Sequence, residues 1–263
     1  MPFPGKQSGA TAHVLPEEDD EAPGGQMSFL EHLDELRRRI VYSLLAVAVG
    51  LIAGFLLINK ISAFLLEPTN SVLPPGRHMI YTQPGEAFSF NIQIALIAAV
   101  VFASPIIMYQ VWLFIAPGLY QNEKKMAIPF VTLSTLGFLA GALFNHYVVF
   151  KFMMRFFASF DTDDLVFMPK LDDVFDLYTK MLLGMGLVFQ MPTIILFLAK
   201  MKLVTWRFLA RHFKYAILII FIIAAVITPS PDAVTQTIFA APMIGLYAVG
   251  IVIAWIVGPK TKA

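Results

Sequence analysis

The chain has 263 residues, of which 58% are hydrophobic and 14% are charged. Soluble domains usually hold about 45–50% apolar and about 25% charged residues, so this chain has too few polar side chains to cover a surface in water. That excludes an ordinary soluble enzyme, a disordered protein and a nucleic-acid binder. The net charge of +1 implies no bulk electrostatic partner, and the absence of cysteine excludes disulfides, cysteine-bound metals and thiol catalysis. The composition indicates a helical membrane protein with several spans.

The first 26 residues differ from the rest, because they combine Gly and Pro with the acidic run Glu17–Glu21. Such a segment buries little apolar surface and is typical of a disordered tail. We therefore predict an acidic tail over 1–26, a membrane domain over 27–260 and a short C-terminal end over 261–263.

Six apolar stretches are long enough, or nearly so, to cross a bilayer as helices. Crossing about 30 Å of hydrocarbon takes about 20 residues, and only a helix or a closed barrel satisfies the backbone there. Alternation suited to a barrel is absent. The predicted spans are Ile40–Ile58, Ala87–Ile115, Met126–Phe150, Leu177–Ala199, the short Tyr215–Ile227, and Val234–Val257.

The distribution of Lys and Arg predicts the orientation of these spans. Most of the 19 basic residues fall on the side that holds the N-terminus, and basic loops stay in the cytoplasm. We therefore predict a multi-pass membrane protein with both termini in the cytoplasm. The basic residues on that side are Lys6, Arg37, Arg38, Arg39, Lys124, Lys125, Lys200, Lys202, Arg207, Arg211, Lys214, Lys260 and Lys262.

Two glutamates stand on the predicted cytoplasmic side. Glu35 lies in an amphipathic lead-in to the first span and can pair with Arg39 at i, i+4, whereas Glu123 precedes two lysines. Two carboxylates on one face suit a ligand with two guanidinium groups, since Arg–carboxylate pairs can be bidentate. A solvated helix start, and a simple pairing of Glu123 with a lysine, remain open as alternatives.

Polar residues within the spans are few. Gln190 lies in the fourth span, just before Pro192, and its amide needs a partner on another helix or a wet cavity. Asn145 and His146, near the end of the third span, are expected at the membrane interface.

No catalytic set emerges from the sequence. Ser and His do not recur at a nucleophile spacing, no ligand cluster suggests a metal, and no GxxxxGK[ST] loop is present. We therefore expect no enzyme activity and no cofactor. A secondary transporter for a small solute and an intramembrane enzyme are the competing hypotheses, but internal repeats and midplane ionisable sites are not evident.

Several ordered motifs carry a family resemblance that extends over Met27–Lys260. They are His32–Arg39 (HLDELRRR), Ser104–Tyr120 (SPIIMYQVWLFIAPGLY), Glu123, Phe189–Pro192 (FQMP) and Thr228–Asp232 (TPSPD). With these motifs the chain resembles TatC, the multispanning receptor subunit of the twin-arginine protein translocase.

The resemblance implies an all-α membrane fold of six helices in a concave, glove-like arrangement, located in the bacterial cytoplasmic (inner) membrane. It implies binding of the twin-arginine signal peptides of folded cargo, with Glu35, Glu123, Arg37, Arg39 and Phe114 matching the recognition site. It further implies proton-motive-force-driven export with the single-span partners TatA and TatB, other copies of the chain, and membrane lipid, without nucleic acid.

The resemblance also assigns roles outside the recognition site. Pro68 matches a functionally sensitive proline of the first outer loop, and Thr228 and Gln236 match a patch where TatA and TatB dock. Many relatives carry Glu where this chain has Gln190, and Gln cannot titrate; we assign Gln190 a polar contact or wet-cavity role. Asp232 closes the proline turn of residues 228–232, in which we expect the serine between the two prolines to have little effect on the orientation of the neighbouring helices.

Overall fold

The computed structural model describes residues 29–74, 76–115, 127–228 and 232–258. The predicted tail over 1–26 and the C-terminal end over 261–263 lie outside these ranges. Helices dominate the described residues. In chain order they are α1 (Phe29–Leu56), α2 (Ile58–Asn70), α3 (Glu86–Ile115), α4 (Ala127–Phe144), the π-helical turn η3 (Asn145–Val149), α5 (Phe150–Ala158), α6 (Leu171–Val188), α7 (Met191–Lys200), α8 (Trp206–Arg211), α9 (Phe213–Ile227) and α10 (Ala233–Val257).

Five helical segments are long and apolar enough to cross a membrane. They are Leu30–Leu56, Glu86–Ile115, Ile128–Ala158, Leu171–Lys200 and Ala233–Val257, and each contains most of one predicted span. The predicted fifth span, Tyr215–Ile227, forms the helix α9, which is apolar but shorter than the others. An all-helical membrane protein is thus confirmed, whereas the sixth crossing and the glove-like arrangement stay predictions.

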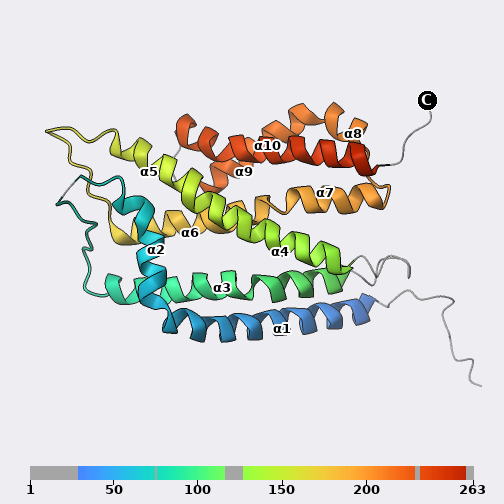
Figure 1. The fold of residues 1–263 in the computed structure, drawn as a ribbon, viewed down its shortest axis with the longest axis horizontal. Coiled ribbons are helices and arrows are strands. Elements are labelled where there is room, and N and C mark those ends of the chain that lie inside the picture. The colour runs from blue at the N-terminus through green and yellow to red at the C-terminus, as the bar shows by residue number, and fades with distance from the viewer. Residues whose placement is uncertain (1–28, 75, 116–126, 229–231, 259–263) are drawn as a thin grey trace, which may run out of the picture.

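Most of the helices lie roughly side by side along one long direction, whereas α2 runs across it (Figure 1). α1 packs on α3 at one edge, α9 packs on α10 at the opposite edge, and α4 and α6 join the two. We call the end where α1 begins and α3 ends the basic end, after Arg37, Arg38 and Arg39. The other end, with Glu67, Glu86 and Asp161, is the acidic end.

Glycines set the closest helix contacts. Gly50 and Gly54 of α1 face the backbone of α3, where a Cβ on Gly50 would lie 2.7 Å from the Ala99 carbonyl oxygen and one on Gly54 2.8 Å from that of Ala95. Small residues four apart let two membrane helices approach closely and pack well. The contact therefore fixes the register of α1 on α3.

The same device recurs between α4 and α6. A Cβ on Gly141 would lie 2.6 Å from the Met185 carbonyl oxygen, and one on Gly137 would lie 3.0 Å from that of Phe189. Next to this contact lies the main core, in which buried methionines and aromatics of α3, α5, α6 and α10 interlock. Its most buried members include Ile94, Met153, Tyr178, Met181, Met185, Phe239 and Met243.

The fourth predicted span is two helices. α6 ends at Val188 and α7 begins at Met191, with Phe189 and Gln190 forming a turn between them. Pro192 stands in the first turn of α7, where its missing N–H costs no intrahelical hydrogen bond. The proline therefore starts a new helix here.

The two long loops at the acidic end are joined to each other. The Arg77 guanidinium pairs with the Asp161 carboxylate, and Ile80 and Lys170 form an isolated parallel bridge. The Lys170 ammonium in turn pairs with Glu86 at the start of α3. These contacts connect the segment before α3 to the segment before α6.

Candidate functional site at the basic end

A polar triad links α1 to α3 at the basic end. Arg39 Nη2 donates to Glu35 Oε1 at 2.8 Å, and Arg39 Nη1 donates to Gln110 Oε1 at 3.3 Å. The side chain of Glu35 is 13% exposed and that of Arg39 is 23% exposed. The predicted i, i+4 pair of Glu35 and Arg39 is thereby confirmed. Gln110 was not predicted as a site residue; a buried amide near the end of an apolar helix is the signal that could have identified it.

The register between α1 and α3 explains this triad. Arg39 precedes Gly50 by eleven residues, and Gln110 follows Ala99 by eleven, in antiparallel helices. Eleven residues make about three turns of α-helix, so each polar residue returns to the face that carries the glycine contact. The Gly50–Ala99 contact thus brings Arg39 and Gln110 together.

One carboxylate oxygen of Glu35 has no hydrogen-bond partner among the described residues. Glu35 Oε2 is buried and accepts no hydrogen bond from the part of the chain that the structure describes, and Arg39 Nε is likewise buried without a partner there. A buried polar atom without a partner carries a desolvation cost that a ligand can relieve. Glu35 Oε2 can therefore accept a hydrogen bond from a bound ligand.

An apolar groove begins beside this pair. It has a volume of about 300 Å³ and runs between α1 and α3, past Arg39 and Gln110. Its lining residues are Leu36, Ile40, Ser43, Leu44, Val47, Ile107, Val111 and Phe114, besides the two polar residues. Phe114 also stacks on His32, with ring centroids 4.4 Å apart. An apolar segment with a cationic start would match this combination of charge and groove.

The other predicted recognition residues are not gathered here. Arg37 is exposed, and it lies about 200° around α1 from Arg39, since each residue turns the helix by about 100°. Glu123 falls outside the described residues. The structure therefore brings Glu35, Arg39 and Phe114 to one site and sets Arg37 on a different face.

Gln190 lies in a second polar contact, deeper in the bundle. Its Nε2 donates to the backbone carbonyl of Ser134 at 2.9 Å, while Trp112 Nε1 donates to the Ser134 hydroxyl at 2.7 Å. All three residues are buried. Ser134 thus joins α3, α4 and the turn between α6 and α7.

The predicted docking residues flank the turn between α9 and α10. Thr228 is buried and its hydroxyl donates to the Ala224 carbonyl at 2.8 Å. Asp232 is the N-cap of α10 and accepts from the Thr235 N–H at 2.7 Å. Gln236 follows in the first turn of α10 and is half-buried. Both helix ends are thus tied by side-chain hydrogen bonds.

The remaining predicted residue, Pro68, lies inside α2 and is buried. Its carbonyl accepts from the Ser71 hydroxyl at 2.9 Å. Pro68 therefore sits in the last turn of an amphipathic helix rather than in an extended loop.

Asn145 and His146 face the inside of the protein, and their expected depth at the membrane interface stays a prediction. Both are buried in η3, and His146 Nδ1 lies 3.0 Å from the Tyr178 hydroxyl while its ring stacks on Phe64. The Phe64 ring on α2 covers the histidine from outside, which sequence spacing cannot reveal. No three His, Asp or Glu side chains among the described residues are placed to hold a metal ion.

Comparison with known proteins gives consistent matches. The family model of the Sec-independent protein translocase protein (TatC) matches residues 31–242. A TatC protein of Desulforapulum autotrophicum is 38% identical over 92% of this chain and 88% of its own length. One of Helicobacter pylori (strain J99) is 40% identical over 88% of this chain and 90% of its own length.

Solved structures agree with these relatives. Two crystal structures of the twin arginine translocase receptor TatC superpose with TM-scores of 0.75 and 0.76, at 33% and 34% identity. They cover 85% and 84% of this chain, and 98% of each of those chains.

Proposed function

Since the chain belongs to the TatC family of Sec-independent protein translocase proteins, we propose that its basic end receives the twin-arginine signal peptides of folded cargo. One observation carries this proposal. Glu35 is held by Arg39 with its second carboxylate oxygen buried and unpartnered among the described residues, next to an apolar groove.

The chemistry of a guanidinium fits this carboxylate. A guanidinium presents parallel N–H donors that match a carboxylate, whereas an ammonium acts as a point charge. A signal arginine would donate to Glu35 Oε2 while Arg39 keeps Oε1. A charge-assisted hydrogen bond of this kind contributes about 1.5–3 kcal/mol. Glu123 would receive the second arginine, and Arg37 would lie outside the direct contact.

The apolar part of the signal would continue into the groove between α1 and α3. Ile40, Leu44 and Val47 on one side face Ile107 and Val111 on the other. Transfer of an apolar side chain from water into this groove contributes about 1.5–3 kcal/mol. Phe114, fixed by its stack on His32, would border the point where charge gives way to apolar surface.

Binding of a twin-arginine peptide to the full chain in nanodiscs tests the proposal. We expect a twin-lysine peptide, or either Glu35→Gln or Glu123→Gln, to weaken binding by about tenfold or more. Asp34→Asn is the matched control, because Asp34 is an exposed neighbour on the same helix turn. Equal binding of the two peptides, or indifference to Glu35→Gln, would remove the recognition site and leave the family assignment in place.

The orientation of the chain can be tested separately. We propose that the basic end faces the cytoplasm, that both termini lie there, and that α9 is the sixth crossing. Because the chain has no cysteine, single cysteines introduced at Ser159 and Lys202 report the two ends without background. An impermeant thiol reagent should label Ser159→Cys from outside intact cells and should leave Lys202→Cys unlabelled; the reverse pattern would invert the topology.

For the acidic end we propose docking of TatA and TatB, with proton-motive-force-driven export by the assembled translocase and other copies of the chain. Thr228 and Gln236 support this assignment, because they lie at the neighbouring ends of α9 and α10, where Asp232 caps α10. Cysteine crosslinking from Gln236 to a single-span partner tests it. Crosslinks equally strong from the exposed Val249 of α10 would refute a site at the turn.

A further inference from the structure

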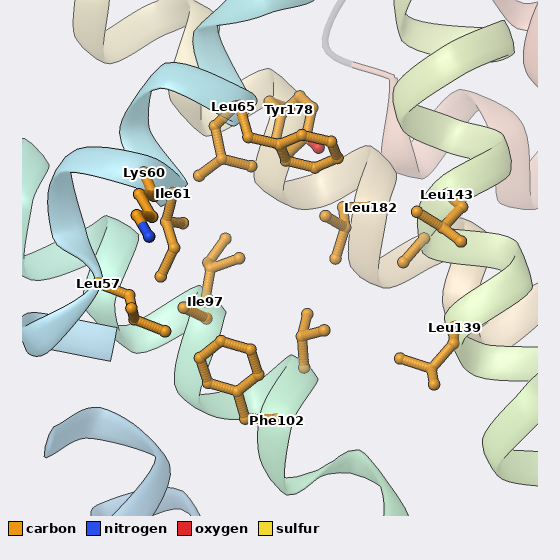
Figure 2. Close-up of a pocket in the computed structure, with 14 residues that line it drawn as sticks. Leu57, Lys60, Ile61, Leu65, Ile97, Phe102, Leu139, Leu143, Tyr178 and Leu182 are labelled. Carbon is orange, nitrogen blue, oxygen red and sulfur yellow. The ribbon is translucent and has the colours of Figure 1, made fainter. Parts of the chain in front are cut away.

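A second apolar cavity opens at the other side of α3, towards the acidic end (Figure 2). Its volume is about 380 Å³, and side chains of α2, α3, α4 and α6 converge on it. The lining residues Leu65, Ile97 and Leu182 are buried, whereas Phe102 and Leu143 are about half exposed, at 46% and 50%. The cavity therefore opens on the apolar surface of the membrane domain.

Lys60 is the one charged residue among the described residues that line this cavity. It stands in the first turn of α2, beside Ile61, directly after the outward end of α1 (Figure 2). The described residues supply its ammonium with no ion-pair partner. The nearby carboxylate of Glu67, on the same helix, pairs instead with Lys151 at 3.2 Å. Lys60 is thus an available cation at the rim of an apolar cavity.

The depth of Lys60 matches that of a lipid headgroup. α1 is apolar from Ile40 to Leu56 and ends four residues before Lys60, so the ammonium stands where the hydrocarbon ends. A lysine at this depth places its charge in the headgroup layer and its methylenes in the apolar layer. A phosphate at this level would meet Lys60, and an acyl chain below it would reach the cavity.

We propose that this cavity is a binding site for one anionic phospholipid, with its phosphate on Lys60 and an acyl chain between α2, α3 and α4. An apolar helix of another protein would leave the ammonium uncompensated against apolar surface, which is unfavourable. A zwitterionic headgroup would set its own cation against Lys60. An anionic headgroup compensates the charge, and its chain fills the apolar volume.

Native mass spectrometry of the delipidated full-length chain tests the site with three added lipids of identical chains. We expect phosphatidylglycerol to be retained about tenfold better than diacylglycerol, and better than phosphatidylcholine, because one charge-assisted contact is gained. Lys60→Gln should abolish the preference for phosphatidylglycerol. Arg155→Gln is the control, since Arg155 is an exposed cation of the acidic end that does not line the cavity.

The apolar half of the site has its own matched pair of variants. Ala142→Leu fills the cavity and should reduce retention of phosphatidylglycerol, whereas Ala140→Leu, exposed on the same helix, should not. A phosphatidylglycerol with a photoreactive acyl chain should label α2, α3 or α4 of the unsubstituted chain, so the site is tested even if a variant fails to fold.

Three results would overturn the proposal. They are equal retention of all three lipids, unchanged retention in Lys60→Gln, and photolabelling that avoids the lining residues. The last result would show that the acyl chain does not enter the cavity.

Discussion

The Lys170 ammonium lies 2.9 Å from the carboxylate of Glu86, whose side chain is only 2% exposed. The Thr82 N–H and hydroxyl donate to the same carboxylate at 3.0 and 3.1 Å. Glu86 is therefore a buried acid with a full set of partners, contributed by two loops that are distant in sequence. The hydrogen bond between Lys170 and Glu86 raises the pKa of Lys170. The ion pair therefore persists as the pH rises, until that raised pKa is reached.

Breaking this pair should destabilise the acidic end. We expect Lys170→Met to lower the unfolding midpoint by several degrees, because it leaves a buried carboxylate unpaired. Adding Glu86→Gln to Lys170→Met should recover part of the loss. Lys180→Met is the control: Lys180 and Asp176 form an exposed i, i+4 pair, which contributes little. Equal losses in the two lysine variants would contradict this expectation. Thermal unfolding in detergent measures these three variants and the unsubstituted chain.

The contacts of Asp161, which join the same two loops, should make the stability of the protein depend on pH. The Phe167 N–H, together with the Arg77 guanidinium, lowers the pKa of Asp161. A carboxyl whose pKa is lowered by folding stabilises the protein above its ordinary pKa of about 3.9, and that stabilisation is lost as pH falls through the lowered value.

The unfolding midpoint of the wild-type chain should therefore decrease as the pH falls below about 4, and Asp161→Asn should make that decrease smaller. Asp163→Asn, in the same loop but exposed, should keep the wild-type slope. If both variants show the same slope, Asp161 does not carry the acid dependence.

The contact between α1 and α3 gives a prediction that couples stability to binding. Gly50→Leu should force the helices apart, with a cost of about 1–3 kcal/mol for overpacking. The same substitution should weaken twin-arginine peptide binding, because the register that pairs Arg39 with Gln110 starts at Gly50. Gly245→Ala should be neutral or stabilising by up to about 1 kcal/mol, since nothing lies within 4 Å of its added Cβ. Peptide binding unchanged in a folded Gly50→Leu chain would separate the two effects.

Gln190 should tolerate only a hydrogen-bond donor. Gln190→Leu removes the bond to the Ser134 carbonyl and should cost about 0.5–1.5 kcal/mol. Gln190→Glu should cost more at neutral pH than at acid pH, because only a protonated carboxyl can donate to that carbonyl. Ser134→Ala leaves the carbonyl in place, so it should affect Trp112 fluorescence and spare the Gln190 contact. A Gln190→Glu chain with no pH dependence would mean that the side chain has turned elsewhere.

Composition and local spacing were sufficient for part of this structure. Apolar runs located the five long spans, and i, i+4 spacing predicted the pair of Glu35 and Arg39, because both depend on neighbours along one helix. The bond from Arg39 to Gln110 depends on how two helices meet. The sequence signal for this helix contact was the GxxxG pattern of Gly50 and Gly54. That pattern indicates which face of α1 packs on another helix but does not identify the other helix.

Other features lay beyond sequence reasoning for a different reason. The burial of His146 depends on the Phe64 ring from α2, which is distant in sequence. The break at Gln190 had a local signal in Pro192, but the apolar run continues past it, so hydropathy predicted a single span. Likewise, the joining of the two acidic-end loops needs charges that meet only after the helices have packed. Hydropathy does not report such contacts.

The order of synthesis follows from the paired loops. Arg77 and Glu86 are each 84 residues ahead of their partners Asp161 and Lys170. At about 5–20 residues per second, the ribosome needs roughly 4–17 s to make up that interval. With the topology proposed above, the first loop would cross the membrane before its counter-charges are made, and the acidic end would close only after the second loop has crossed as well.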